Sequence, residues 1–414
     1  MRVLEILPLI HGILYVSLQS ALLTGLFLER RRETGGLGKA GNPSGTSSGA
    51  LPRVSVVVPV HNEESRLPAL LEDLAAQDYD GLEIVLVDDR SSDGTAGLLS
   101  GFAGGRDNVR VVCLKENPGP NHKQYALERG LAVAAGDLLL FTDADCRIGP
   151  AWAGAMAARM GDPRVGATIG PVFKSWPGGQ DRLSFGSAVL PPEKAGGFLY
   201  SYQCYDHVVR FVYLAGAVGL GAAGGGFGNN LILRRAALEA AGGYAAVPPS
   251  PTEDAALISL IRSSTDYRIR AVYGARTHVY TKPETSWKAL INQTLRWNNG
   301  GLFSPEIVTR INYTILMLTI TVCTLALFLM PLYPKLWPMP LAQFIVMLEN
   351  TLGAVCIARG GRWKGRGTET RSSLPPLFWL RELLVMPFYM TLMTVLGFLG
   401  VKTTWKETTM GPRA

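Results

Sequence analysis

The chain has 414 residues, of which 18% are charged and 47% are hydrophobic, and its formal net charge is +7. Its mean hydropathy of +0.17 favours a membrane protein over a soluble one. The basic residues cluster beside apolar runs, as in the cytoplasmic flanks of membrane helices, so we expect no nucleic-acid partner. The five cysteines are scattered without a CxxC or zinc spacing, which argues against a disulfide framework or a structural zinc site.

Residues 1–33 predict an N-terminal transmembrane anchor. The stretch from Ile6 to Leu28 carries no Asp, Glu, Lys or Arg and has the length of a bilayer-spanning helix. Its basic cluster, Arg30 to Arg32, follows the apolar run instead of preceding it, which is unlike a cleaved signal peptide and places this end in the cytoplasm. Residues 34–50 are rich in Gly, Ser and Thr and predict a flexible linker.

Residues 51–305 predict an α/β domain with a mostly parallel sheet. Apolar runs at 53–60, 82–87, 109–114 and 137–142 read as buried strands that alternate with helical patterns. Ligands of such sheets bind beyond the carboxyl ends of the strands. Asp88 and Asp89 follow the second run, where helix capping is the alternative role. Asp143 and Asp145 follow the fourth run, and two carboxylates so close can share a hard cation.

Residues 306–414 predict a C-terminal membrane domain with apolar stretches at 311–330, 341–358 and 383–401. The basic connection 358–371 should lie in the cytoplasm. The last stretch either crosses the bilayer once or is broken by Pro387 into an interfacial pair. Glu349 could contact a lipid or glycan, or it could face other helices. The segment 178–226, rich in Gly and aromatic residues, could be a surface-lying amphipathic element or a core helix.

Six motifs occur in order: VSVVVPVHNEES, IVLVDDRSSDGTA, LLLFTDADC, GGGFGNNLILRR, the triplet TED and the pentapeptide QTLRW. They resemble the successive signatures of family 2 glycosyltransferases, including polysaccharide synthases and lipid-glycosylating enzymes such as ceramide glucosyltransferases. The resemblance covers about residues 51–305. It implies a GT-A fold, a nucleotide-sugar donor, and Mg²⁺ or Mn²⁺ as cofactor.

The resemblance also implies residue roles. The expected donor-binding residues are Pro59, Asn62, Glu63, Asp88, Asp89, Lys123, Asp143, Gln293 and Arg296. The expected acceptor-binding residues are Gly228, Asn229, Asn230 and Trp297, and the expected metal ligands are Asp145 and Asp143. Asp254 is the candidate general base, with Glu253 beside it. The alternative for Glu253 and Asp254 is an acidic pair favoured by a helix N-terminus, and for Arg296 and Trp297 an interfacial helix.

The predicted function is an inverting, metal-dependent hexosyltransferase in the cell (inner) membrane, multi-pass, with its catalytic domain in the cytoplasm. It would move sugar from a UDP-sugar, with UDP-glucose favoured, to a lipid or isoprenoid hydroxyl at the bilayer. The alternative is a processive synthase of a cell-surface polysaccharide, although the chain has few apolar segments for a glycan channel. A sugar nucleotidyltransferase is disfavoured because a GxGTR-type loop does not follow the first strand, and a catalytically dead scaffold because every expected acidic position is filled.

Overall fold

The computed structural model describes residues 2–37, 51–174, 197–360, 380–405 and 408–410. Its strands are β1 (Val54–Val60), β2 (Leu82–Asp89), β3 (Val109–Leu114), β4 (Leu138–Phe141), β5 (Cys146–Ile148), β6 (Val165–Ile169), β7 (Val172–Lys174), β8 (Leu231–Arg234), β9 (Arg268–Ala271), β10 (Val279–Thr281), β11 (Thr403–Trp405) and β12 (Thr408–Met410). Its helices are α1 (Arg2–Leu37), α2 (Leu67–Ala75), α3 (Thr95–Ala103), α4 (His122–Val133), α5 (Trp152–Ala157), α6 (Phe198–Gly219), α7 (Arg235–Ala240), α8 (Glu253–Ser264), α9 (Trp287–Leu302), α10 (Ile307–Leu329), α11 (Pro338–Gly360) and α12 (Leu380–Phe398).

The main sheet has seven strands in the order β3-β2-β1-β4-β8-β6-β9. Strands β1 to β4 pair in parallel, whereas β8 runs antiparallel to both β4 and β6. The four strand runs expected from the sequence form this parallel half, so the prediction of a mostly parallel α/β sheet is confirmed. Apolar side chains on both faces of the sheet explain why β1, β2 and β4 are almost continuously buried.

A second, three-stranded sheet of β5, β10 and β7 lies at the end of β4. Strand β5 begins only five residues after β4 ends and pairs antiparallel with β10. The short connection between β4 and β5 contains Asp143 and Asp145, so both carboxylates are fixed between two sheets.

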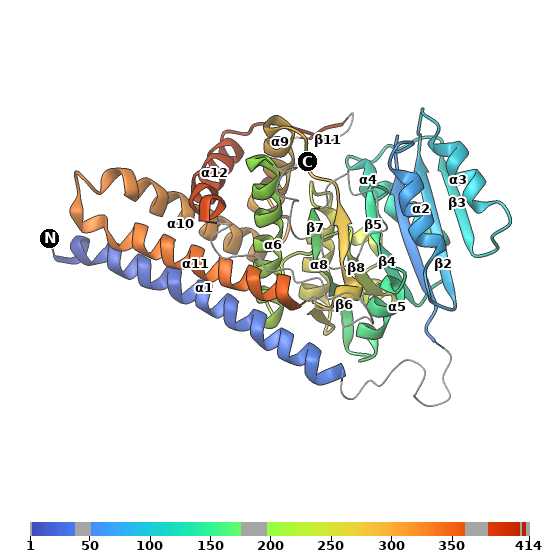
Figure 1. Ribbon diagram of the computed structural model, residues 1–414, viewed down its shortest axis with the longest axis horizontal. Helices are drawn as coiled ribbons and strands as arrows, with labels where there is room; N and C mark the ends of the chain where they lie inside the picture. The colour runs from blue at the N-terminus through green and yellow to red at the C-terminus, as the bar shows by residue number, and fades with distance from the viewer. Residues whose placement is uncertain (1, 38–50, 175–196, 361–379, 406–407, 411–414) are drawn as a thin grey trace.

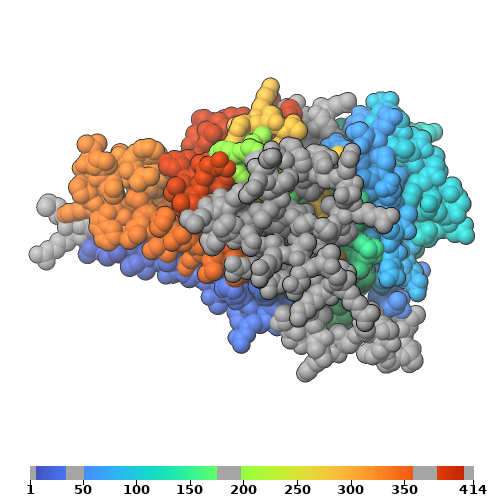
Figure 2. Space-filling model, in the orientation of Figure 1, coloured from blue at the N-terminus to red at the C-terminus, as the bar shows by residue number. Residues whose placement is uncertain are grey.

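Four helices among the described residues are long and apolar enough to cross a membrane: Ile6–Glu33, Ile307–Leu329, Pro334–Ile357 and Leu380–Phe398. They correspond to the four apolar stretches predicted from the sequence. In Figure 1, α1, α10 and α11 extend together from one end of the α/β domain, and Figure 2 shows the same projection in space-filling form. Their outward faces carry exposed Leu, Ile, Val and Phe side chains, as expected for contact with lipid.

Helix α6 joins the membrane helices to the sheet. Most of its side chains are buried, so the described part of the segment 178–226 forms a core helix and not a surface-lying one. An added Cβ at Gly25 of α1 or at Gly219 of α6 would collide with the backbone of the other helix. Small residues therefore let α1 and α6 approach closely. The C-terminal end of α1 is also fixed, because Glu29 accepts a hydrogen bond from Arg270 at 3.0 Å.

Helix α12 is continuous through Pro387, so the expected alternative of a break at this residue is wrong. Near its start, Ser201 of α6 donates to Glu382 at 2.6 Å, and further along Asn298 of α9 donates to the Met393 carbonyl at 3.1 Å. Beyond its end, Thr404 exchanges hydrogen bonds with Asn292 of α9. The tail after α12 therefore lies against α9 of the α/β domain.

Two further sequence expectations concern the membrane helices and the linker. Ser20 of α1 donates to Glu349 of α11 at 2.6 Å, which supports the interpretation that Glu349 faces another helix. Helix α1 continues to Leu37, so the first four residues of the predicted linker are helical. Residues 38–50 of that linker, 178–196 of the glycine-rich segment and 361–371 of the basic connection lie outside the described residues.

Candidate active site

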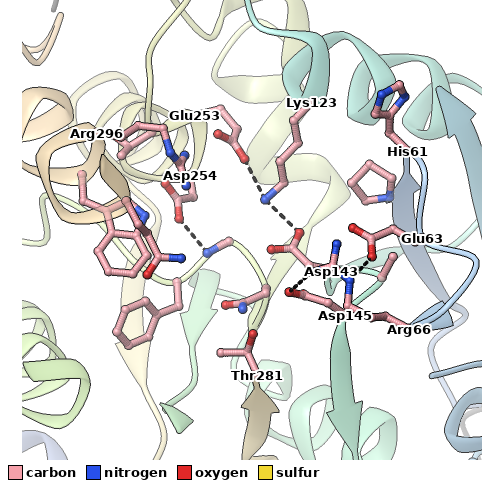
Figure 3. A pocket seen from close by; sticks show the side chains of 18 of the residues that line it. His61, Glu63, Arg66, Lys123, Asp143, Asp145, Glu253, Asp254, Thr281 and Arg296 are labelled. Atoms are coloured by element: carbon pink, nitrogen blue, oxygen red, sulfur yellow. Dashed lines mark hydrogen bonds and ion pairs between the residues drawn. The ribbon is translucent and has the colours of Figure 1, made fainter. Parts of the chain in front are cut away.

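A cavity of about 350 Å³ lies at the carboxyl ends of β1, β2 and β4, and we call it the polar cavity. Thirteen of the residues predicted for the site line it: Pro59, Glu63, Asp89, Lys123, Asp143, Asp145, Gly228, Asn229, Glu253, Asp254, Gln293, Arg296 and Trp297. They come from strand ends, from helix N-termini and from α9. The ordered motifs of the sequence therefore meet in one place (Figure 3).

Asp143 and Asp145 lie at the floor of the polar cavity. A hydrogen bond of 3.1 Å from the Cys146 N–H to the Asp143 carbonyl closes the turn that contains both residues. Asp145 lies 3.8 Å from the Arg66 guanidinium, and the Cys146 thiol donates to Asp145 at 3.8 Å. Burial, followed by the charges of Asp145 and Asp143, raises the pKa of Cys146 well above its usual value. The two carboxylates thus concentrate negative charge where a cation would be stabilised.

Lys123, at the start of α4, connects the two acidic motifs. Its Nζ lies 2.8 Å from Asp143 Oδ1 and 3.1 Å from Glu253 Oε1 (Figure 3). Burial alone would lower the pKa of this amine, but Asp143 and Glu253 raise it well above the usual value. Lys123 is therefore a permanent cation at the centre of the polar cavity.

Asp254 lies in the first turn of α8, and Gly228 and Ala255 donate backbone N–H groups to its two carboxylate oxygens at 2.6 and 2.8 Å. Burial, followed by the charge of Glu253, raises the pKa of Asp254 to about 6, although Lys123 opposes this rise. Such a carboxylate is ionised at neutral pH yet basic enough to accept a proton. The helix N-terminus expected for the Glu253–Asp254 pair is also observed, so the two interpretations are compatible.

The opposite wall of the polar cavity comes from the ends of β1 and β2. His61 and the Asp89 carbonyl form a hydrogen bond of 2.5 Å, and Arg90 donates to the Asp89 carboxylate at 2.9 Å. Glu63 forms an ion pair of 2.5 Å with Arg66. These contacts fix a wall of alternating charge at the place where the sequence predicts the nucleotide.

The α9 motif supplies the remaining wall. Arg296 donates to the Pro251 carbonyl at 3.1 Å and Gln293 donates to Glu284 at 2.8 Å. Arg296 forms no ion pair among the described residues, so its charge is available to the cavity. The Trp297 ring lies 5.3 Å from the Arg210 guanidinium, within the range of a cation–π contact.

Three predicted residues do not line either cavity. Asn62, with a φ of 53°, accepts a hydrogen bond from the Ser92 N–H, and Asp88 accepts one from the Ser91 N–H. Both side chains brace the turns after β1 and β2. Asn230 is fully buried, and it accepts from Trp152 and donates to two carbonyls. We therefore correct the acceptor-binding prediction for Asn230, whose amide is already fully hydrogen-bonded inside the core.

Sequence reasoning missed Lys174, His207, Glu284 and Thr404, which also line the polar cavity. Lys174 is the last residue of β7, so a search for charged residues of either sign at strand ends could have found it. Burial lowers the pKa of Lys174. Burial, followed by Lys174 and Arg210, also lowers the pKa of His207 well below its usual value, and its ring stacks on Phe227. No sequence pattern around Thr404 predicts a role for it, and it lines the cavity only because the tail after α12 packs against α9.

A divalent metal can be tested against these side chains. No group of three His, Cys, Asp or Glu side chains with the geometry of a metal site occurs among the described residues. Mg²⁺ is commonly held by one or two carboxylates together with substrate phosphates. Asp143 and Asp145 supply that number of hard oxygen donors on one short turn. The residues therefore fit a metal that binds together with a diphosphate.

A second cavity of about 240 Å³, which we call the apolar cavity, lies between α1, α6, α8, α9, α10, α11 and α12. Its membrane end is lined by Leu316, Met317 and Ile320 of α10. Its other end reaches residues that also line the polar cavity, namely Phe227, Thr252, Asp254 and Trp297. A path lined by membrane helices thus ends at the candidate general base.

Comparison with known proteins gives two family matches. Residues 55–214 match the model of glycosyl transferase family 2, and residues 143–399 match that of glycosyl transferase family group 2. A solved structure of the mannosyltransferase PcManGT from Pyrobaculum calidifontis, in complex with GDP-Man and Mn²⁺, has a TM-score of 0.50 and 18% sequence identity. It covers 96% of this chain and 99% of that chain.

Curated relatives match shorter regions. An N-acetylglucosaminyltransferase of Sinorhizobium fredii is 35% identical over 133 residues, which are 31% of this chain and 32% of the relative. An undecaprenyl-phosphate 4-deoxy-4-formamido-L-arabinose transferase of Proteus mirabilis is 41% identical over 105 residues, which are 24% of this chain and 30% of the relative. The chain thus spans about a third of the length of these relatives.

Proposed function

Because this chain belongs to glycosyl transferase family group 2 and is a glycosyltransferase, we propose that it moves a hexosyl unit from a UDP-sugar to a membrane lipid. Its GT-A-like sheet and its candidate membrane helices suit an enzyme that meets a soluble donor and a lipid acceptor. The observation that supports this proposal most directly is that Asp254 lines both the polar and the apolar cavity. One carboxylate thus faces both substrates.

The proposed donor site is the polar cavity. Asp89 and Glu63 line the wall proposed for the nucleoside, and Arg296 is free to make paired hydrogen bonds to phosphate oxygens. A divalent ion, Mg²⁺ or Mn²⁺, on Asp143 and Asp145 would neutralise the charge that develops on the leaving diphosphate. The Mn²⁺ in the complex of PcManGT is in keeping with such an ion. UDP-glucose and UDP-N-acetylglucosamine are the first donors to test.

The proposed chemistry is a direct, inverting displacement. An acceptor oxygen forms a bond to the anomeric carbon while the bond from that carbon to the diphosphate breaks, and the electron pair leaves with UDP. Asp254 takes the proton of the acceptor hydroxyl. Lys123 holds Asp143 and Glu253 in place during this step, so that the leaving group and the base keep their separation.

The proposed acceptor is lipid and not a growing polymer. The apolar cavity lies between helices and ends at Asp254, which supports access from the bilayer. The name of the Proteus mirabilis relative, an undecaprenyl-phosphate sugar transferase, also supports a lipid-linked acceptor. The basic cluster after the first apolar run supports a catalytic domain on the cytoplasmic face of the cell (inner) membrane.

The test is incubation of the full-length enzyme in membranes with radiolabelled UDP-glucose or UDP-N-acetylglucosamine and either metal. We expect label in an organic-soluble product, with none when the metal is removed by EDTA. Label in a long water-soluble or insoluble glycan would instead establish a polysaccharide synthase.

A further inference from the structure

The polar cavity contains a buried ammonium group that is not paired with any carboxylate among the described residues. Lys174, at the end of β7, lines this cavity and is 3% exposed. Its Nζ donates one hydrogen bond, to the Lys282 carbonyl at 3.4 Å, and lies 6.0 Å from the centre of the Trp297 ring. An ammonium has three N–H donors, and a buried charge is costly unless it is hydrogen-bonded. The remaining donors of Lys174 are therefore available to a ligand.

Three carboxylates act on the charge of Lys174: Asp145, Glu284 and Asp206. Burial lowers the pKa of Lys174, and these carboxylates oppose this change. Asp206 is already bonded to Arg210 at 2.7 Å, and Asp145 is one of the two proposed metal ligands. Glu284 is therefore the carboxylate that remains to balance Lys174.

Glu284 follows β10 and is held in a fixed position. Gln203 of α6 accepts from its N–H at 2.7 Å and donates to its carbonyl at 3.0 Å. Gln293 of α9 donates to its Oε1 at 2.8 Å, and Oε2 has no hydrogen bond within the described part of the chain. Glu284 and Lys174 thus line one cavity with opposite charges but do not form an ion pair with each other. The space between them suits a group that both donates and accepts hydrogen bonds, such as a hydroxyl.

The position of these side chains indicates which part of the substrate they face. Figure 3 shows His61 on one side of the turn that contains Asp145, and Thr281 on the other side. Thr281 of β10 pairs with Cys146 of β5 and with Lys174 of β7, so Lys174 lies two strands, or about 10 Å, from β5. A nucleoside near His61 and a diphosphate at the acidic turn therefore leave the region of Thr281 and Lys174 for the sugar.

The contacts of the sugar can be narrowed further. Asp254 and Trp297 line both cavities, and the apolar cavity is the proposed path of the acceptor. By contrast, Lys174, Thr281 and Glu284 belong to the described lining of the polar cavity alone. The reacting carbon, C1, has to lie between the diphosphate and Asp254. Because C4 is opposite C1 in a pyranose ring, the hydroxyl on C4 points towards the part of the cavity that is farthest from the diphosphate.

From this arrangement, and on the basis of the proposed UDP-hexose donor, we propose that Lys174 and Glu284 form the subsite that recognises the C4 hydroxyl of the transferred sugar. Lys174 donates to this hydroxyl, and the hydroxyl donates to Glu284. A neutral hexose suits this pair, whereas Glu284 would repel a sugar that carries a carboxylate at this place. Both residues determine donor specificity and take no part in bond breaking.

The first test compares donors on the wild-type enzyme. The full-length protein in membranes is given UDP-glucose or UDP-N-acetylglucosamine with Mn²⁺, then the 4-deoxy analogue of the donor that it uses, and release of UDP is measured. We expect kcat/KM to be lower by at least about 100-fold for the 4-deoxy donor, because a site built to hydrogen-bond a hydroxyl rejects an analogue that lacks it. A difference of less than about threefold would overturn the proposal. If neither parent donor is used, the proposed UDP-hexose donor is refuted, and this subsite with it.

The second test removes the ammonium group. Lys174→Met should lower kcat/KM by about 100-fold for the parent donor but by less than about threefold for the 4-deoxy donor, which lacks the contact already. Binding of UDP with Mn²⁺, measured by calorimetry, should stay within about threefold of wild type and shows that the variant is folded. The matched control is Lys288→Met, which changes an exposed lysine of α9 and should keep all three values.

Two results with a folded Lys174→Met variant would overturn the proposal. Loss of UDP binding would place Lys174 at the diphosphate, and equal losses with both donors would make its role structural. If Lys174→Met does not fold, Glu284→Gln gives the same comparison from the other side of the hydroxyl. We then expect a loss of about tenfold in kcat/KM with the parent donor and little change with the 4-deoxy donor. Equal losses with the two donors would again contradict the subsite.

Discussion

The polar and apolar cavities meet at Asp254 but are built in different ways. The polar cavity collects side chains from strand ends and helix N-termini, and its charges are fixed by short ion pairs such as Lys123 with Asp143. The apolar cavity is a gap between helices, and it depends on glycines and on the distance between α1, α6 and α10. The polar cavity thus holds the charged side chains, whereas the apolar cavity is defined mainly by its shape.

This contrast explains how one family can serve many acceptors. The donor and its metal require the same few carboxylates whatever the sugar is given to. The acceptor is recognised by the volume and the charge of a space between helices, which many different side chains can produce. Experiments should therefore separate the two cavities, with Asp254 as the residue on which both depend.

Asp254→Asn is expected to have the largest effect. Its amide cannot take the acceptor's proton, so the transfer rate should fall by about 10²- to 10⁴-fold. Binding of the UDP-sugar, measured by calorimetry in the presence of Mn²⁺, should stay within a few-fold of wild type. The control is Asp266→Asn, an exposed carboxylate just beyond α8. Transfer that persists in Asp254→Asn would show that another group is the base.

Asp145→Asn should affect the donor side alone. Loss of one carboxylate from a site that offers two should weaken metal-dependent donor binding by about 10- to 100-fold, a size seen when the surroundings of a metal are disturbed. A thermal-shift titration of Mn²⁺ with UDP present measures this change. Asp162→Asn, which removes a carboxylate paired with Arg164 at the surface, is the control. An unchanged Mn²⁺ requirement in Asp145→Asn would show that the metal binds to other residues.

The two cavities also differ in how well the sequence reveals them. Asp143 and Asp145 follow a buried strand, and the parallel βαβ pattern brings strand ends together, so the sheet and the acidic cluster could be predicted. Asn230 belongs to the same motif as Asn229, but only the three-dimensional structure shows that its amide is used inside the core. The order of the motifs along the chain predicts which residues lie close together in the fold, but it does not predict the direction in which each side chain points.

The membrane end of the apolar cavity has no motif. Residues such as Leu316, which line this end, look like any membrane-facing residue in the sequence. The route of the tail was likewise open, because the hydropathy of α12 is the same whether the helix crosses the bilayer or follows the domain. The contact of Thr404 with Asn292 shows that the tail lies against α9, which the sequence does not indicate.

The pH dependence should report the state of Asp254 at the meeting point of the cavities. Burial raises its pKa to about 6, and the base must be ionised to accept a proton. The transfer rate should therefore be constant above pH 7 and fall about tenfold per pH unit below pH 6. Donor binding, measured over the same range, separates this titration from loss of substrate. A rate that stays flat down to pH 5 would contradict the assignment of the base.

The smallest effect on chemistry is expected from Asn230→Ala, with Asn229→Ala as its matched neighbour. Asn230 makes three hydrogen bonds in the core, so its loss removes this partner from the Trp152 N–H and the Thr277 carbonyl, at about 1–3 kcal/mol for each such group. The Pro171 carbonyl still accepts from the Val279 N–H at 3.3 Å. We expect a clearly lower midpoint of thermal unfolding, while kcat/KM per folded molecule stays within twofold. Asn229 lines the polar cavity, so Asn229→Ala should lower kcat/KM and change the midpoint little. If the two variants exchange these effects, Asn230 contacts the acceptor after all, because a residue that only supports the core changes how much enzyme folds and not how the folded enzyme reacts.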